Sequence, residues 1–334
     1  MRTSIACAVL SLVVSTVAAQ EFTIKFATVA PEGSTWMNVM LEYDAAVRKE
    51  SGGRVGFKIY PRQTQGDEQS VLRKIRVGQL QAGGFTGVGL GDVAPKVRIL
   101  DTPFLVRNYA EVDYLYRTFD AEFRQAFEEG GFELLGWAEV GFVYVFTSIP
   151  VEKPADLDRI KMWVWEGDPV AETAFRTLNM KPIPLSILDV MTSLQTGLID
   201  AFYTSPLAAV ATQWFTRAKY MVGVRLADAS GAVLISKRYF DKIPPELQEI
   251  LIRNGKKYME KLTMLSRQDN EKAIETLKKQ GIQVTKVPEK DVQQYVEAGD
   301  KARKVLVGTI YTQEFLDRVT QSLREFREAS RGSR

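Results

Sequence analysis

Short stretches in which apolar and polar side chains alternate are separated by longer stretches with helical spacing in the first third of the chain. Phe22, Ile24 and Phe26 alternate with polar residues, and this period of two predicts a strand. A helix is expected over residues 33–50, before the turn that begins at Ser51. The pattern continues as a strand, a helix and a strand at residues 55–59, 67–77 and 80–85. This order is typical of right-handed βαβ units, so we expect an α/β protein with a parallel sheet.

The pattern restarts in the second half of the chain. Residues 132–147 are rich in strand formers and long enough to cross between two domains. After them we expect a strand, a helix, a strand, a helix and a strand at residues 160–165, 169–178, 181–184, 187–196 and 198–203, and a return strand at 233–236. An amphipathic pattern then runs from Pro245 to Gln280 without a breaker. About 36 helical residues at ~1.5 Å each would span roughly 54 Å, so this helix is expected to bridge two domains.

Composition excludes several classes of function. The 334 residues carry 44 basic and 41 acidic side chains, a net charge of +3, and these charges are interspersed, so nucleic acid is not an expected partner. The chain has no histidine, which excludes histidine-based catalysis and metal ligation. Cys7 is the one cysteine, so neither a disulfide nor a thiolate cluster is possible within the chain. No paired carboxylates with an activated nucleophile are discernible, and we expect neither an enzyme nor a bound cofactor or metal.

The N-terminus reads as a secretory signal at residues 1–19. Arg2 supplies the positive charge, an apolar stretch runs from Ile5 to Val17, and small residues precede the cleavage site expected after Ala19. The apolar stretch is only about 13 residues long, against roughly 20 needed to span a bilayer. We therefore expect an exported, periplasmic protein that is not embedded in the membrane.

Two segments are candidates for ligand contact. The glycine-rich residues 83–91 fit neither the dinucleotide nor the P-loop spacing, and they predict a close backbone approach at the sheet edge, which makes Thr86 and Gly87 candidates. Trp163 and Trp165 lie two residues apart and share one strand face, with Tyr203 at another strand end. Core packing explains one tryptophan well, but the set is better explained by a cleft with aromatic walls.

Isolated charges among apolar neighbours have two interpretations. Asp67 and Glu68 begin a helix, where acidic residues are favourable without any function. Glu139 and Arg98 are each either a ligand partner or half of a structural pair, and we favour the structural interpretation for Arg98.

The chain resembles a known family in five stretches that are spread over essentially the whole mature chain: residues 60–78, 95–105, 160–164, 186–206, and the helix after Pro245 with residues 281–284. The family is the extracytoplasmic solute receptors of tripartite ATP-independent periplasmic (TRAP) transporters, of the DctP type. The resemblance implies a two-domain, type II-like periplasmic-binding-protein fold with hinge strands near residues 136–145 and 224–234 and a domain-spanning helix. The expected domains are residues 20–140 with 225–265 and residues 141–224 with 266–330, with the solute cleft between them. The implied partners are a small solute and the small and large permease subunits, and we expect a monomer.

One departure from the family pattern concerns the solute. The family strand motif has the form Lys-x-Arg-Val, whose arginine pairs with a solute carboxylate, and this chain has Trp163 at that position. One hypothesis is an amphipathic or aromatic acid that stacks on Trp163 and Tyr203, and it fits the family better. The other is a solute without a carboxylate, which fits the missing arginine better. The remaining candidate contacts for the two hypotheses are Thr28, Asp67, Thr86, Gly87, Glu139, Trp165, Ile187, Thr204 and Ser205. A receptor that signals to a sensor instead of a permease is a further alternative.

Overall fold

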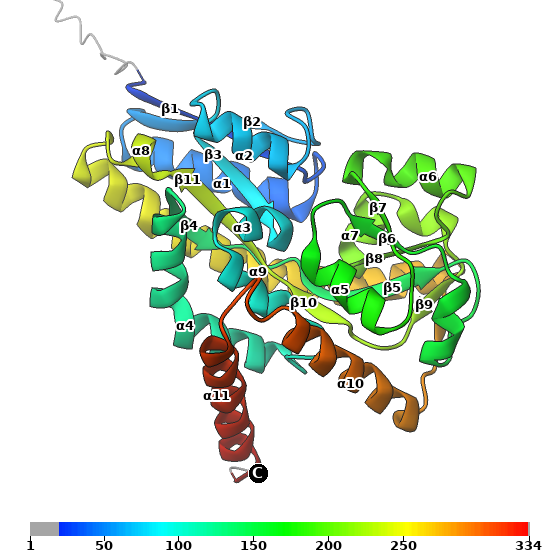
Figure 1. Ribbon diagram of the computed structural model, residues 1–334. Coiled ribbons are helices and arrows are strands. Elements are labelled where there is room, and N and C mark those ends of the chain that lie inside the picture. Colours follow the sequence, from blue (N-terminus) through cyan, green and yellow to red (C-terminus); the bar gives the residue numbers. More distant parts are fainter. Residues whose placement is uncertain (1–19, 333–334) are drawn as a thin grey trace, which may run out of the picture.

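The first of two large sheets is built mainly from the N-terminal third of the chain. The structure is a computed structural model that describes residues 20–332. The sheet has the order β2-β1-β3-β11-β4, with β1 parallel to β2 and β3, and with β11 antiparallel to β3 and β4. Its strands are β1 Phe22–Thr28, β2 Val55–Tyr60, β3 Ala82–Thr86, β4 Phe132–Trp137 and β11 Gly231–Ser236. We call this sheet and its covering helices the first lobe (Figure 1).

The second lobe is built on a mixed sheet of the order β10-β5-β9-β12, with β8 also paired to β5. A separate parallel pair, β6 with β7, lies beside it. The strands are β5 Gly141–Thr147, β6 Trp163–Trp165, β7 Ile183–Leu185, β8 Ala201–Thr204, β9 Tyr220–Val222, β10 Ala227–Ala229 and β12 Gln283–Thr285. The α/β class and the predicted strands are confirmed, and β6 is shorter than the predicted 160–165. The expected parallel arrangement holds for β1, β2 and β3, but both large sheets are mixed, because β11 and β5 pair antiparallel with their neighbours.

Helices cover both sheets. The first lobe carries α1 Thr35–Glu50, α2 Glu68–Arg76, α3 Gly87–Val93, the 3₁₀ helix η1 Pro95–Asp101, α4 Tyr109–Glu129 and α8 Lys237–Phe240. The second lobe carries η2 Pro154–Arg159, α5 Pro169–Thr177, η3 Ile187–Asp189, α6 Val190–Thr196, α7 Pro206–Ala211 and η4 Trp214–Arg217. Capping side chains mark where several helices begin. An N-cap side chain accepts a hydrogen bond from a backbone N–H of the first turn in α1, α2, α4, α5 and α7; these residues are Ser34, Asp67, Asn108, Asp168 and Ser205.

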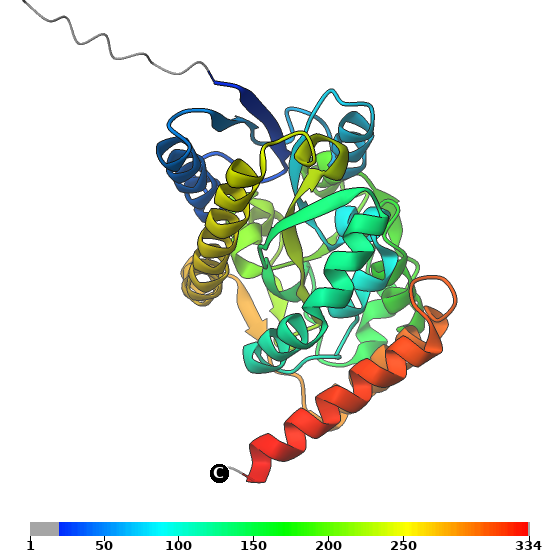
Figure 2. The ribbon, with the colours of Figure 1, turned by 90° about the vertical axis from the view of Figure 1, so that its left-hand side faces the viewer.

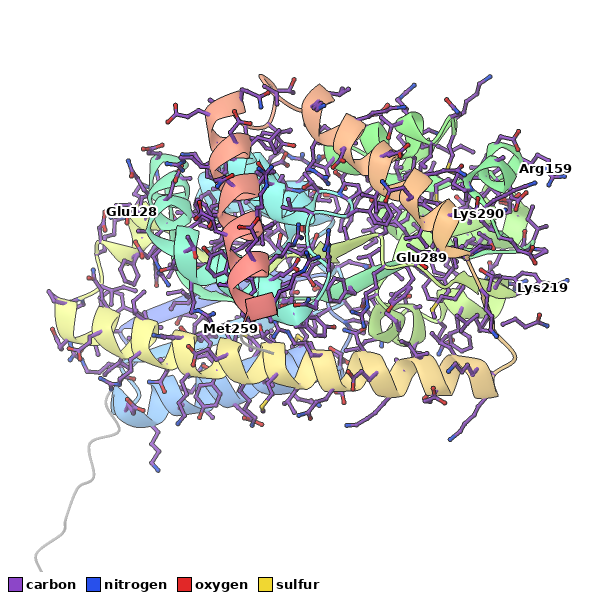
Figure 3. The ribbon with its side chains drawn as sticks, turned by 90° about the horizontal axis from the view of Figure 1, so that it is seen from below. Glu128, Arg159, Lys219, Met259, Glu289 and Lys290 are labelled. Atoms are coloured by element: carbon purple, nitrogen blue, oxygen red, sulfur yellow. The ribbon has the colours of Figure 1, made fainter. Side chains whose placement is uncertain are left out.

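A single helix, α9 Pro245–Lys279, runs along the whole molecule, as the view from below shows (Figure 3). Its first half packs on α1 and β4, and its buried Leu251 and Leu262 belong to the core of the first lobe. Its second half packs on α7, and Leu277 belongs to a second core cluster that contains residues of both lobes. The predicted bridging helix is therefore confirmed, with an end within one residue of the predicted position.

Within residues 20–280, two backbone segments besides α9 connect the lobes. Residues 138–140 join β4 to β5, and Ser230 joins β10 to β11. The two segments run side by side, because Ala138 N–H donates to the Gly231 carbonyl at 2.7 Å and Val140 N–H donates to the Ala229 carbonyl at 3.0 Å. They lie within the two ranges in which the sequence predicted hinge strands.

Two segments lie outside the lobe to which the predicted division assigned them. Strand β10, expected with the first domain, pairs with β5 of the second sheet. The C-terminal helix α11 Gln313–Gly332, expected with the second domain, packs on α4 of the first lobe, whereas α10 Glu289–Val305 packs on α5 of the second (Figure 2). Phe326 on α11 stacks on Tyr114 of α4 at 4.4 Å between ring centroids, which explains the position of α11. No local sequence pattern indicates this long-range packing.

Candidate functional site

A cavity of about 130 Å³ lies between the lobes, at the carboxyl end of β3 and beside the segments that join the sheets. The first lobe lines it with Thr86, Gly87 and Val88 after β3, and with Arg98 and Asp101 from η1. The lining from the segments between the lobes and from the second lobe includes Val140, Val143, Trp163, Trp165, Asp168, Val170, Tyr203, Thr204, Ser205, Trp214, Leu226, Ala227, Asp228 and Ala229. Both lobes are thus needed to form the cavity, and we call it the cleft.

A second cavity of about 140 Å³ shares Thr86, Val140 and Ser205 with the cleft. It extends along the first lobe to Thr28 and Trp36, and reaches α7 of the second lobe. None of the residues that line it carries a charge. We call it the outer chamber, and the two cavities form one interlobe site.

Aromatic rings make up one wall of the cleft. Trp163 stacks on Tyr203 with 5.2 Å between ring centroids and an interplanar angle of 25°, and it meets Trp214 edge-on at 5.3 Å. The indole N–H of Trp163 donates to the Leu185 carbonyl at 3.0 Å, and the side chain is only 2% exposed. Because the two rings stack on each other, a solute meets the edge of this cluster and cannot enter between them. Trp163 is therefore both a core residue and a wall residue.

The charged side chains of the cleft form a buried set that joins the lobes. Arg98 of η1 donates to Asp101 at 2.8 Å and, across the cleft, to Asp168 at 2.8 Å. Asp168 caps α5 and also accepts from the Tyr203 hydroxyl at 3.2 Å. Burial raises the pKa of Asp101, although Arg98 opposes this. The structural interpretation of Arg98 holds, since both of its partners are carboxylates of the chain.

Glu68 holds the backbone at the first-lobe edge of the cleft in place. Its carboxyl group accepts from the backbone N–H of Thr86 at 2.7 Å and of Gly89 at 2.8 Å, and from the Thr86 hydroxyl. Burial raises the pKa of Glu68 to about 8, although these hydrogen bonds favour the ionised form. From the sequence, Glu68 was interpreted only as a charge at a helix N-terminus. Its hydrogen bonds to the backbone at the edge of the cleft were not predicted.

Gly84 in β3 and Gly87 at the start of α3 serve packing within the chain. A side chain on Gly84 would collide with the Trp36 ring, and one on Gly87 would collide with the Asp101 carboxylate. The close approach that the sequence predicted at this sheet edge therefore involves side chains of the protein itself. Gly87 also lines the cleft.

The cleft brings together seven of the predicted contact residues: Thr86, Gly87, Trp163, Trp165, Tyr203, Thr204 and Ser205. Thr28 lines the outer chamber instead. Asp67, Ile187 and Glu139 line neither cavity. Asp67 caps α2 through Ser70 N–H at 2.8 Å, and Ile187 packs beside the core, so local structure explains both.

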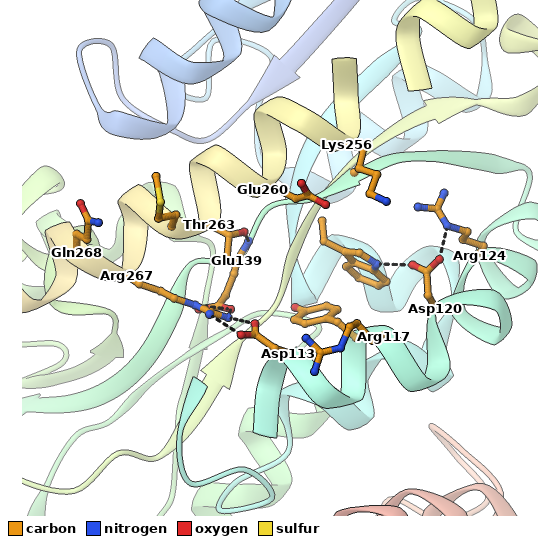
Figure 4. Close-up of a pocket in the computed structure, with 14 residues that line it drawn as sticks. Asp113, Arg117, Asp120, Arg124, Glu139, Lys256, Glu260, Thr263, Arg267 and Gln268 are labelled. Atoms are coloured by element: carbon orange, nitrogen blue, oxygen red, sulfur yellow. Dashed lines mark hydrogen bonds and ion pairs between the residues drawn. The ribbon is translucent and has the colours of Figure 1, made fainter. Parts of the chain in front are cut away.

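Glu139 lies at a different place, in a groove of about 770 Å³ between α4 and α9 (Figure 4). Its carboxylate is 1% exposed and pairs with Arg267 of α9, which also pairs with Asp113 of α4. The Glu139 N–H donates to the Thr263 hydroxyl at 3.3 Å. Of the two interpretations that the sequence left open for Glu139, the structural pair is therefore the one that the geometry shows.

Several residues of the cleft were not predicted as contacts, among them Asp101, Asp168 and Trp214, and Arg98 was expected to be structural. Asp168 and Arg98 lie 70 positions apart, so no local pattern could pair them. The sequence offers one signal for this pair: Asp168 directly precedes Pro169. That signal indicates a helix cap and not a contact with Arg98.

Two features of residues 20–332 bear on other functions. No group of three or more acidic residues there is placed to hold a metal ion. None of the helices in that range is both long and apolar enough to cross a membrane.

Comparison with known proteins gives one consistent result. The model of the family described as "Bacterial extracellular solute-binding protein, family 7" (DctP) matches residues 26–307. The 2,3-diketo-L-gulonate-binding periplasmic protein YiaO of Escherichia coli is 26% identical over 249 residues, which cover 73% of this chain and 74% of that protein.

Solved structures show the same fold. A TRAP periplasmic solute-binding protein of Haemophilus influenzae with bound L-gulonate superimposes with a TM-score of 0.85 at 20% identity, and covers 91% of this chain and 99% of its own. One of Desulfovibrio salexigens with bound orotic acid gives the same TM-score, identity and coverage.

Proposed function

Because the chain belongs to the DctP family of bacterial extracellular solute-binding proteins, we propose that it is the solute receptor of a TRAP-type secondary transporter. It binds a small organic solute between its lobes and delivers the solute to the two membrane subunits of the permease. The observation that carries the proposal is a cavity lined by both lobes, which are joined only by α9 and two paired strand connections over residues 20–280. Proteins of this kind close around a solute by hinge motion.

The solute that this site fits is small and has an apolar or aromatic part. The cleft wall of Trp163, Trp165 and Trp214 offers apolar area, and Thr86, Thr204 and Ser205 offer hydroxyl groups. Several similar structures hold organic acids, such as gulonate, orotic acid and glucuronate, which supports an organic acid as one candidate class. The aromatic wall supports a ring or an alkyl chain in either candidate class.

The place of action is proposed from the family and from the N-terminal sequence. Residues 1–19, read as a signal peptide, lie outside the described residues. We propose that the chain is exported to the periplasm and cleaved after Ala19. The intact mass of the protein recovered from the periplasm tests this, because it should correspond to a chain that starts at Gln20.

Uptake by cells tests the transport function. Small molecules released from the purified, denatured protein are identified by mass spectrometry, and the uptake of the labelled compound is measured with and without the gene. We expect uptake to be lost with the gene, to return with the wild-type chain, and to stay low with a Trp163→Ala variant. Unchanged uptake together with a lost transcriptional response would favour the sensor alternative.

A further inference from the structure

The interlobe site has a single basic side chain among the described residues that line it. Among the residues that line the cleft and the outer chamber, all of them within residues 20–332, Arg98 is the only lysine or arginine. Three carboxyl groups, those of Asp101, Asp168 and Asp228, line the same cleft. Burial raises the pKa of Asp228 well above its ordinary value. The charge balance of the cleft therefore rests on Arg98, Asp101 and Asp168. An incoming carboxylate would thus find no unmatched positive charge, in surroundings that screen charge poorly.

The charge of Arg98 is already matched by carboxylates of the chain itself. The arginine is 4% exposed, its Nε donates to Asp101, and its Nη2 donates to Asp168, both at 2.8 Å. Asp168 belongs to the second lobe and Arg98 to the first. A carboxylate of the protein itself therefore pairs with the arginine across the cleft. Asp168 is held in this place by Val170 N–H at 3.0 Å, Ala171 N–H at 3.2 Å and the Tyr203 hydroxyl.

The rest of the site suits groups without charge. The Thr204 hydroxyl has no hydrogen bond to another described residue, so it is free to donate to a solute and to accept from one. The Thr86 hydroxyl donates to Glu68 and keeps its lone pairs free to accept. Tryptophan rings and Val140, Val143 and Val170 supply the apolar surface.

We propose that the site selects an uncharged solute, with its apolar part against the tryptophan wall and a hydroxyl, carbonyl or amide group at Thr204 and Thr86. Asp168 supplies the carboxylate that Arg98 requires, so the solute supplies none. This inference rests on the proposed receptor function and names the class of its ligand.

A panel of matched compounds tests the class. The probes are 3-phenylpropionamide, 3-phenylpropionate and 3-phenylpropylamine, and the corresponding pentanamide, pentanoate and pentylamine. Thermal unfolding of the mature protein is followed at equal probe concentrations, since a ligand that binds only the folded state raises the midpoint. We expect an amide to raise it by a few degrees and to bind at least tenfold more tightly in titration calorimetry than its acid and its amine.

A larger shift with an acid or an amine overturns the proposal, and so does a panel in which no amide shifts the midpoint. Binding of an acid would leave the receptor function intact, so the two failures are distinguishable. The receptor function fails separately, if deletion of the gene leaves uptake unchanged.

An Asp168→Asn variant tests the positioning role of Asp168. Asparagine keeps a cap for α5 but removes the charge, so Asp101 is left as the only carboxylate partner of Arg98. We expect the acid of the panel to gain at least tenfold in affinity while the amide changes little. The matched control is Glu172→Gln on the same helix, which alters an exposed pair with Arg176 and should leave both affinities unchanged. If Asp168→Asn folds and the acid gains nothing, the role assigned to Asp168 is wrong; if it does not fold, the wild-type panel decides the class.

Discussion

Trp163 is the residue at which core packing and ligand contact coincide. Its ring contacts Tyr203, Trp165 and Trp214, and its N–H has a carbonyl partner, so the ring position is fixed before any solute arrives. A fixed ring loses little entropy when a ligand contacts it. The same packing means that a substitution at this position changes both stability and binding.

Trp163→Ala should therefore show two effects. We expect the free energy of unfolding to fall by about 3–5 kcal/mol, as for other large-to-small substitutions in a core, and the affinity for the solute to fall at least tenfold. Denaturant unfolding and titration calorimetry measure the two effects. Trp163→Phe, which keeps a ring, is the control and should lose less of both. Unchanged affinity in the alanine variant would assign Trp163 to the core alone.

Glu68 makes stability depend on pH. Its pKa in the folded protein is about 8, against 4.5 for an ordinary glutamate, so the folded state holds an extra proton between these values. This contribution to stability is complete below about pH 4.5, and it is lost as the pH rises through about 8. We expect the unfolding midpoint in urea to fall between pH 6 and pH 9, and a Glu68→Gln variant to show a smaller fall. Equal falls in both proteins would contradict the assignment to Glu68.

At the scale of elements, α9 holds the strand connection at residues 138–140. Thr263, Arg267 and Asn270 lie on successive turns of the helix and contact Glu139 N–H, the Glu139 carboxylate and the Val140 carbonyl. Arg267 also lies over the Tyr109 ring at 4.3 Å. One helix face thus fixes the backbone that connects the two sheets.

Removing Arg267 should leave Glu139 buried without its partner. We expect Arg267→Ala to lower the free energy of unfolding by roughly 3 kcal/mol or more, because breaking a buried ion pair strands a charge. A double variant with Glu139→Gln should recover part of the loss, which a double-mutant cycle measures. Lys272→Ala, on the same helix in an exposed pair with Asp269, is the control and should change stability by less than about 0.5 kcal/mol. No recovery in the double variant would show that Arg267 acts through other contacts.

The elements differ in how far the sequence predicts them. Strands β1 to β3 and helix α9 were predicted because their periodicity and the breakers beside them, such as Gly52 and Pro244, are local signals. The aromatic wall was predicted in part for the same reason, since Trp163 and Trp165 share a strand face. The Arg98–Asp168 pair and the packing of α11 on α4 were not, because each joins residues far apart in the chain and depends on the finished fold.

At the scale of the whole molecule, the cleft lies between two lobes with separate sheets. Buried Arg98 and Asp168 meet across it, so the described form is a closed one in which the lobes touch. Opening the cleft would separate this pair and expose both groups to water.

We expect the solute to shift the molecule further towards this closed form. The radius of gyration from small-angle scattering should decrease when the solute is added at saturation. The Trp163→Ala variant should need more solute for the same decrease. A radius that does not change with a solute shown to bind by calorimetry would mean that the lobes are already closed without it.

The continuity of α9 limits how the lobes can separate. The helix is fastened to the first lobe through α1 and β4 and to the second through α7, and it has no proline or glycine between Gly255 and its end at Lys279. A sharp kink in that stretch would have no usual cause. The helix therefore behaves as a stiff elastic rod that is fixed at both ends. Any opening must bend α9 gently over several turns or break its contacts with one lobe. The range of opening is therefore set by the bending stiffness of a helix and not by the freedom of a loop.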